Sequence, residues 1–326
     1  MKQISECLNI ARTWLKVGSA DNRSATKAPD SADCDHRASV TPTIRDYMLF
    51  EQVASSSELA ELAERLPEFF TDDTEDVIRR HCEVHGIASD FQGRVLGDRV
   101  AILGDEMREH LLVDGLNSRQ RAVAELLIHF LAERGISESA ARIYGHEGVT
   151  PLAGALRGRF LRFLGSEYAP THEQQEWLWP IPHADVCALD FPDQTFDAIV
   201  SCDVFEHVPN LDAALSEAAR VLRPGGRLFA TFPFHWYSEE TLVYATIENG
   251  ELKHHLEPIY HGNPVDADGG SLVFQIPGWD VIERAKNAGF SRASMTLYCS
   301  QLKGIVASSR LEPMRPKGVF ITAFDR

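Results

Sequence analysis

Short apolar segments alternate with amphipathic ones along the C-terminal two-thirds of the chain. The apolar runs predict strands over residues 142–147, 162–167, 183–186, 196–202 and 227–232. Helical spacing of apolar residues predicts helices over 151–160 and 210–222, the second stopped by Pro224-Gly225-Gly226. Such alternation is typical of a parallel sheet with helices on both faces, so the expected fold class is α/β.

A capped helix is predicted just before this alternation. Asn117 is a favoured N-cap residue and Gly135 a favoured stop. With about 100° of rotation per residue, Arg119 falls on the same side as the apolar stripe, whereas Arg121 falls at its edge. A buried guanidinium needs an anionic partner. The sequence leaves open whether that partner is an internal carboxylate or the carboxylate of a ligand.

The N-terminal third has a different pattern. Residues 1–41 combine a short amphipathic segment with a Ser- and Asp-rich stretch typical of a flexible linker. From Ile44 to about Arg80 apolar residues follow helical spacing, which predicts a helical lobe or lid over 42–116. The main domain is then expected over 117–326, with an insertion at 235–277 that contains a hairpin around Asn249-Gly250.

Composition narrows the functional classes. The 326 residues carry a net charge of −16 and no run of basic side chains, which disfavours nucleic acid as a partner and favours a small-molecule substrate. No apolar run reaches the length of a membrane span, and the N-terminus lacks an uninterrupted signal region, so a cytoplasmic protein is expected.

Six cysteines without a CxxC pair fit reduced thiols. The segment from His81 to His85 has no second ligand pair, so no metal is predicted. The oligomeric state stays open.

Acidic residues follow the predicted parallel strands. Glu147, Glu167, Asp185 and Asp203 each stand at a strand's carboxyl end, where open parallel sheets bind their ligands. An acidic residue about 20 positions after the first strand end, as Glu167 is from Glu147, suits the hydroxyls of a ribose. The pattern therefore indicates a nucleoside-containing ligand.

Three stretches carry a family resemblance: His183–Pro192, Phe196–Val208 with the sequence Asp203-Val-Phe-Glu206-His207, and Arg220–Leu228 with Pro-Gly-Gly. Together they resemble the central half of a class I S-adenosylmethionine-dependent methyltransferase. The resemblance covers about residues 117–326 and implies a Rossmann-like seven-stranded sheet whose final strand, near 319–324, is antiparallel. It also implies that Glu167 holds the ribose, that Asp185 with the backbone of Val186 receives the adenine, and that residues from Asp203 onward line the methionine end.

The first motif departs from the family pattern. After Glu147 the chain has one glycine, Gly148, and then Pro151 stiffens the turn. A dinucleotide needs a glycine-rich approach to its pyrophosphate, so NAD and FAD are disfavoured. S-adenosylmethionine carries no phosphate and remains compatible.

Candidate site residues follow from these patterns. His207 has a side chain suited to proton abstraction, although a structural role in its loop fits equally. The expected catalytic residues are His207, Asp203, Tyr237 and His261. The expected cofactor-binding residues are Arg119, Tyr144, Glu147, Glu167, Asp185, Val186, Asp203 and Phe205.

Three functions remain open from the sequence. The first is methyl transfer from S-adenosylmethionine to a small molecule, in secondary metabolism. The second uses S-adenosylmethionine as the substrate: its amino group closes onto its own γ-carbon, giving azetidine-2-carboxylate and methylthioadenosine. The third is a non-catalytic cofactor-binding protein.

Overall fold

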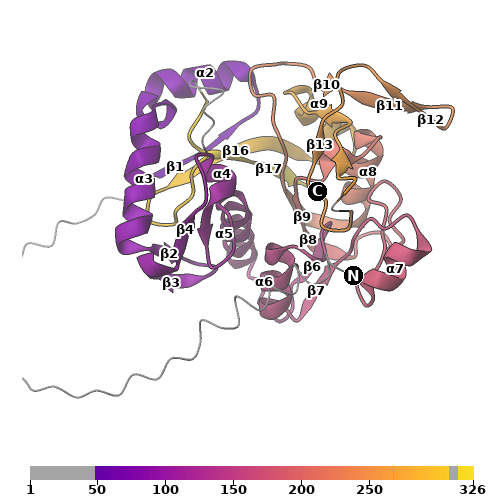
Figure 1. Cartoon of the computed structure of the whole chain (residues 1–326), viewed down its shortest axis with the longest axis horizontal. Helices are drawn as coiled ribbons and strands as arrows, with labels where there is room; N and C mark the ends of the chain where they lie inside the picture. Colours follow the sequence, from indigo (N-terminus) through magenta and orange to yellow (C-terminus); the bar gives the residue numbers. More distant parts are fainter. Residues whose placement is uncertain (1–47, 267, 308–314) are drawn as a thin grey trace, which may run out of the picture. The chain divides into compact units, whose positions relative to one another are not determined.

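A computed structural model describes residues 48–266, 268–307 and 315–326 (Figure 1). The predicted N-terminal helix and linker at 1–41 lie outside this range. The chain separates into two units, Met1–Ile44 and Arg45–Arg326, and all the described residues belong to the second.

The second unit is built on one seven-stranded sheet. In spatial order the strands are β1 (Met48–Val53), β16 (Arg292–Ser300), β17 (Val319–Asp325), β9 (Leu222–Thr231), β8 (Phe196–Cys202), β6 (Arg142–Gly145) and β7 (Arg162–Gly165). Strands β7, β6, β8 and β9 are parallel, whereas β17 runs antiparallel to both β9 and β16. The α/β class and the antiparallel final strand predicted from the sequence are therefore confirmed.

Eight α-helices and three 3₁₀ helices are found in the described part of the chain. The α-helices are α2 (Ser56–Arg65), α3 (Asp72–His85), α4 (Met107–His110), α5 (Ser118–Glu133), α6 (Pro151–Arg159), α7 (His172–Leu178), α8 (Leu211–Val221) and α9 (Asp280–Asn287). The 3₁₀ helices are η1 (Pro67–Phe70), η2 (Gly97–Arg99) and η3 (Phe205–His207).

Two apolar clusters lie on opposite faces of the sheet. Residues of α5 and α6 pack against one face, where Phe130 of α5 meets Phe229 of β9 edge to face. Residues of α8 and α9, together with α2 and α3, pack in the other cluster. Side chains of one strand alternate between the clusters, as the two-residue period of a strand requires: Val200 belongs to the first and Ile199 to the second. The helices thus cover both faces, as the alternating pattern predicts.

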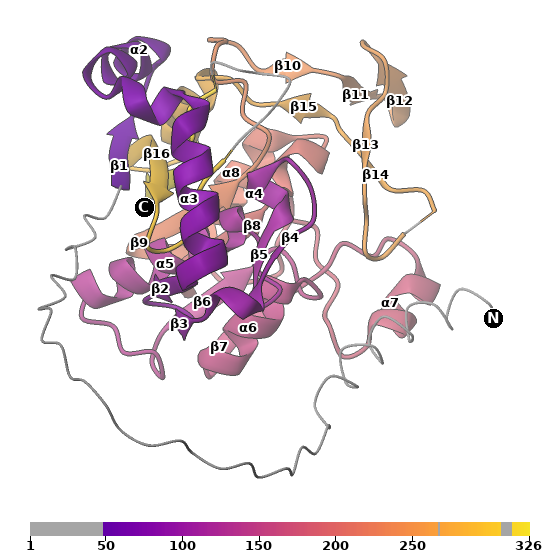
Figure 2. The same ribbon diagram turned by 60° about the vertical axis from the view of Figure 1, so that its left-hand side comes forward.

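The residues before α5 form small paired strands around α3 and α4 (Figure 2). These are β2 (Ile87–Ser89) with β3 (Gly93–Val95), and β4 (Val100–Ile102) with β5 (Leu111–Val113). Much of the expected helical lobe is therefore not helical. Its separation from the main domain stays a prediction.

Two predicted elements differ from the structure. Residues 48–53 are expected to be helical but form β1, an edge strand paired with β16, with Leu49 and Val53 facing the core. Residues 183–186 are expected to form a third parallel strand, but His183 makes a single bridge to Glu167 and the chain turns at Asp185, whose side chain accepts the Cys187 N–H. The seventh strand is thus β1, at the opposite edge.

The insertion carries three pairs of short strands. They are β10 (Leu242–Val243) with β15 (Gln275–Ile276), β11 (Ala245–Glu248) with β12 (Glu251–His254), and β13 (Tyr260–His261) with β14 (Ser271–Leu272). The predicted hairpin is confirmed, since Asn249 and Gly250 join β11 to β12 with φ of 52° and 82°, the turn these residue types favour. No helix in the described ranges is long and apolar enough to cross a membrane.

Candidate cofactor and substrate site

Glu147 is the second residue after β6 and reaches across to the end of β8. Its Oε2 accepts the backbone N–H of Cys202 at 2.8 Å. Burial raises the pKa of Glu147 to about 8, although the positive charge of Arg119 opposes this shift. The carboxyl is therefore poised to ionise when a cation arrives beside it.

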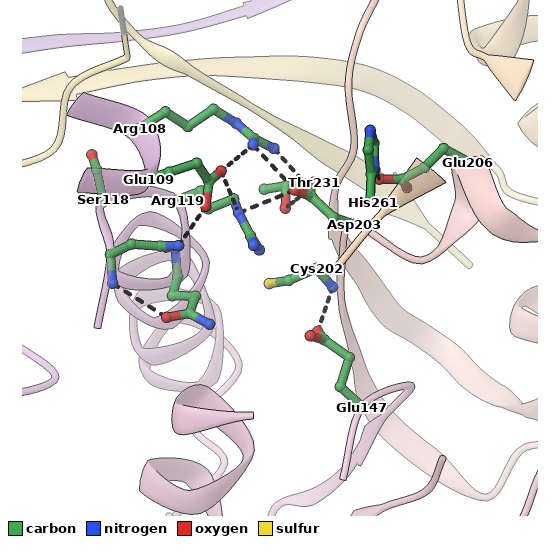
Figure 3. A network of polar contacts seen from close by, with 12 residues as sticks. Arg108, Glu109, Ser118, Arg119, Glu147, Cys202, Asp203, Glu206, Thr231 and His261 are labelled. Carbon is green, nitrogen blue, oxygen red and sulfur yellow. Dashed lines mark hydrogen bonds and ion pairs between the residues drawn. The ribbon is translucent and has the colours of Figure 1, made fainter. Parts of the chain in front are cut away.

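Asp203, the first residue after β8, is the centre of a charged network (Figure 3). Arg108 donates to both its oxygens, at 2.7 and 3.1 Å, and the Thr231 hydroxyl donates at 3.1 Å. Arg119 Nε lies 3.1 Å from Oδ2. Burial alone would raise the pKa of Asp203, but the two guanidinium groups outweigh it and hold that pKa well below its usual range. Asp203 therefore stays ionised, and both of its oxygens accept hydrogen bonds.

Arg119 projects from the first turn of α5 toward this network, as its predicted inward position requires. Its Nε donates to Glu109 at 2.8 Å, and Asp203 lies next to it. Internal carboxylates are therefore partners of this guanidinium. Its Nη1, however, is buried and has no hydrogen-bond partner among the described residues. A buried unpaired donor of a charged group costs free energy unless a ligand satisfies it.

Glu167 lies beyond β7 and fixes the altered first loop. Its Oε1 accepts the backbone N–H groups of Gly148 and Val149, at 2.9 and 3.1 Å. Both amides bond the same oxygen, and no described residue donates a hydrogen bond to Oε2. Gly148 is needed at this close approach, since a Cβ there would lie 2.5 Å from a methyl group of Ile181. Where the family pattern has a glycine-rich loop, this chain thus has a loop whose backbone amides bond the Glu167 carboxylate.

Asp185 and Val186 form the turn beside Glu167. Asp185 Oδ1 accepts the Cys187 N–H at 2.8 Å, and the side chain of Val186 is buried. The assignment of these two residues to the adenine stays a prediction.

Glu206, His207 and His261 form a second polar cluster next to Asp203. Glu206 and His207 lie on η3, and His261 comes from β13 of the insertion. His207 Nδ1 lies 2.9 Å from the Leu272 carbonyl, and His261 Nδ1 lies 3.3 Å from His207 Nε2. Glu206 is fully buried, and burial raises its pKa. The fold therefore brings together His207 and His261, the two histidines predicted to be catalytic.

Three predicted site residues need correction. Tyr144 is fully buried in the core, stacked on Phe196 with its hydroxyl 2.7 Å from Ser166, so it does not face a ligand. Phe205 is likewise fully buried. Tyr237 is exposed, and its ring packs against those of His235 and Trp236. Asp203 is paired with Arg108 and Arg119, and the catalytic role expected of it stays a prediction.

Three residues of the Asp203 network are not predicted from the sequence: Arg108, Glu109 and Thr231. Arg108 and Glu109 lie on α4, a single turn of helix whose sequence has no apolar period. Thr231 is the last residue of β9, and only its place at a strand's carboxyl end could have indicated it.

The fold and these residues define a Rossmann-like α/β domain with a polar ligand site at the carboxyl edge of its parallel strands. Residues 162–230 match the family model of a methyltransferase domain. A demethylmenaquinone methyltransferase of Streptomyces avermitilis is 30% identical over 142 residues, which cover 41% of this chain and 57% of that protein. Squalene methyltransferase 1 of Botryococcus braunii is 50% identical over 52 residues, 16% of this chain and 13% of that protein. The chain spans less than two thirds of the length of either relative.

A solved structure, the 1,6-didemethyltoxoflavin-N1-methyltransferase of Burkholderia thailandensis, is 15% identical, with a TM-score of 0.34 over 64% of this chain and 78% of that chain. The sheet topology is Rossmann-like, and residues 162–230 within it are similar to a methyltransferase domain.

Proposed function

We propose that this chain binds S-adenosylmethionine at the carboxyl edge of β6, β7 and β8 and catalyses methyl transfer to a small molecule. The observation that carries the proposal is the buried, unpartnered Nη1 of Arg119, in the same site as the partly buried carboxyl of Glu147. Arg119 offers a positively charged donor that is unpaired. Glu147 offers a carboxyl whose ionised form a neighbouring cation would stabilise. Together they are complementary to the carboxylate and ammonium of an amino acid.

The rest of the cofactor would be held by the neighbouring strand ends. Glu167 Oε2 is available to accept from ribose hydroxyls, while Oε1 keeps the loop at Gly148 and Val149 in place. Asp185 and the backbone of Val186 would receive the adenine. When bound, S-adenosylmethionine supplies an electrophilic methyl group on a sulfonium. The residues of this chain would hold that group against the acceptor, which is where most of the rate enhancement of such a transfer arises.

The acceptor is proposed to be small because the chain carries a net charge of −16 and its matched relatives are named for small-molecule acceptors. The Glu206, His207 and His261 cluster and the insertion that carries His261 would form its binding wall.

One incubation tests this proposal against cyclisation. Purified protein is incubated with S-adenosylmethionine alone and with a panel of phenols, naphthoquinols and amines, and the nucleoside products are separated. We expect S-adenosylhomocysteine to accumulate only when an acceptor is present. Release of methylthioadenosine from S-adenosylmethionine alone, faster than in buffer, would show that the cofactor is consumed instead and would overturn the proposal.

A further inference from the structure

The cluster of Glu206, His207 and His261 has the composition of a metal site. One carboxylate oxygen and two imidazole nitrogens lie within 4.8 Å of one another. His207 Nε2 and His261 Nδ1 each lie 3.7 Å from Glu206 Oε1, and 3.3 Å from each other. Two nitrogens bound to one tetrahedral ion at the usual 2.0–2.1 Å are separated by about 3.3 Å. The two rings therefore already have the spacing of ligands that share an ion.

Glu206 is the second observation that points to a ligand. Its side chain is fully buried, and neither carboxylate oxygen has a hydrogen-bond partner in the described ranges. Its nearest charged or titratable neighbours are the two imidazoles, 3.7 Å from Oε1. A buried carboxylate that accepts no hydrogen bond is costly, and a cation bound between it and the imidazoles removes that cost.

His207 is oriented as metal-bound histidines usually are. Its Nδ1 donates to the Leu272 carbonyl at 2.9 Å, which leaves the lone pair of Nε2 facing Glu206 and His261. A backbone acceptor on the far ring nitrogen fixes both the tautomer and the direction of the ligand atom.

A second cluster in the chain provides a contrast. Asp90, Glu125 and His129 are also close enough to share an ion. There, however, the ammonium of Lys303 bonds both Asp90 and Glu125, so their negative charge is already compensated. Among the described residues, neither carboxylate oxygen of Glu206 has a lysine or arginine as a hydrogen-bond partner.

We propose that Glu206, His207 and His261 bind one divalent transition-metal ion, with coordination positions left open for oxygen ligands. Two imidazoles and one carboxylate favour Zn²⁺, Co²⁺, Mn²⁺ or Fe²⁺ over Mg²⁺ or Ca²⁺. Three protein ligands leave at least one position open, as in catalytic rather than structural sites. If the proposed methyl transfer is correct, an oxygen of the acceptor would occupy that position. His207 is then a metal ligand and not a base.

The ion can be detected without any enzymatic assay. Untagged protein, stripped with chelator, is titrated with Co²⁺ and its visible absorption recorded; Zn²⁺ is then added. We expect a band that saturates at one equivalent and is bleached by Zn²⁺. Acetohydroxamate, a simple oxygen chelator, should shift the band if coordination positions are open.

Substitutions assign the ligands. Glu206→Gln and His261→Ala should each weaken Co²⁺ affinity by more than about tenfold, the effect typical of disturbing even an outer-shell partner. His129→Ala, in the contrasting cluster, should leave it unchanged. His261 is partly exposed, so its variant is expected to fold, which circular dichroism would check.

Absence of a saturable band in the wild-type protein would overturn the proposal, and so would equal affinity in wild type, Glu206→Gln and His261→Ala. Calorimetric titration of the same samples with S-adenosylhomocysteine separates this outcome from failure of the proposed function. A protein that binds S-adenosylhomocysteine but no metal contradicts only the metal site. A protein that binds the metal but not S-adenosylhomocysteine contradicts only the proposed function.

Discussion

Single residues in this site are held by opposing charges. Asp203 has a φ of 56°, a backbone conformation that costs free energy for a residue with a side chain but is tolerated best by Asp and Asn. That conformation places its carboxylate between Arg108 and Arg119. Arg119 is thereby held in a mostly enclosed position with its Nη1 unpaired.

Replacing Arg119 by lysine tests the role of that donor. Arg119→Lys keeps a positive charge beside Asp203 but removes the planar fork that reaches a ligand carboxylate. The affinity for S-adenosylmethionine should fall by roughly 1 to 3 kcal/mol, measured by calorimetry. Arg108→Lys is the matched control, since Arg108 bonds the same Asp203. It should lower stability while changing affinity much less; equal losses of affinity in both variants would contradict the assignment.

Glu147 gives a pH-dependent prediction. Its pKa is about 8 in the folded chain and is lower when unfolded, so the folded state binds its proton more tightly. The contribution to stability is complete below the unfolded pKa and is lost as the pH rises toward 8. Glu147→Gln does not titrate and can still accept the Cys202 N–H.

In urea unfolding, Glu147→Gln should therefore gain stability over wild type as the pH is raised from 5 to 9, by about 4 kcal/mol across that interval. A difference between the two proteins that is the same at every pH would show that the carboxyl is not perturbed.

At the scale of elements, the helices and strands with a regular apolar pattern could be predicted from the sequence. Strands β6, β7 and β8 and helices α5 and α8 lie within a few residues of the predicted ranges. The prediction for 183–186 is wrong because Pro182 has no N–H to donate and Asp185 starts a turn, so only one bridge to Glu167 forms. Such a turn depends on a side-chain hydrogen bond that a hydropathy pattern does not record.

Two other errors have tertiary causes. Strand β1 has apolar residues on both sides, with Met48 and Phe50 exposed, and this hides its two-residue period. The helical wheel puts Arg121 at the edge of α5, but its side chain is fully buried, because the Leu111, Leu116 and Gly304 carbonyls accept its hydrogen bonds. A helical wheel describes one helix alone, so it cannot show that segments outside α5 cover Arg121.

The insertion is tied to the site by Gln275. Its buried amide nitrogen donates to the carbonyls of Phe205 and Val208, at 3.0 and 2.8 Å, on either side of Glu206 and His207. Gln275→Ala should lower the free energy of unfolding by about 2 kcal/mol. It should also speed hydrogen exchange of the Phe274 amide, which donates to the Glu206 carbonyl. The exposed Gln52→Ala is the control; similar exchange at Phe274 in both variants would contradict this role.

At the scale of the whole molecule, the N-terminal strand β1 completes the sheet that carries the site. Leu49 is 1% exposed and belongs to the same apolar cluster as helices α8 and α9. Leu49→Ala should therefore destabilise the whole domain by about 2–4 kcal/mol, in a single unfolding transition.

Met48→Ala, at an exposed position of the same strand, should have a much smaller effect. An early, separate transition in Leu49→Ala would instead show that β1 belongs to an independently folded lobe, as the domain boundary expected at 116 requires.

The proposed ligand site lies at the carboxyl ends of the parallel strands, because the last residues of these strands meet at one edge. The acidic residues there could be predicted from the sequence, since each follows an apolar run. Arg119, His207 and His261 could also be named as candidates, but the contacts they make could not be predicted. Those contacts depend on α4, which carries Arg108, and on β13, which carries His261, and neither segment has a regular apolar pattern.

Calorimetric titration with S-adenosylhomocysteine tests the central claim most directly. The wild-type protein should bind one equivalent. Glu167→Gln, which can still accept the loop amides through its amide oxygen, and Asp185→Ala should each weaken binding by roughly 1 to 3 kcal/mol, whereas Glu251→Ala on the exposed hairpin should not. No heat from the wild type, or unchanged affinity in both site variants, would contradict the account.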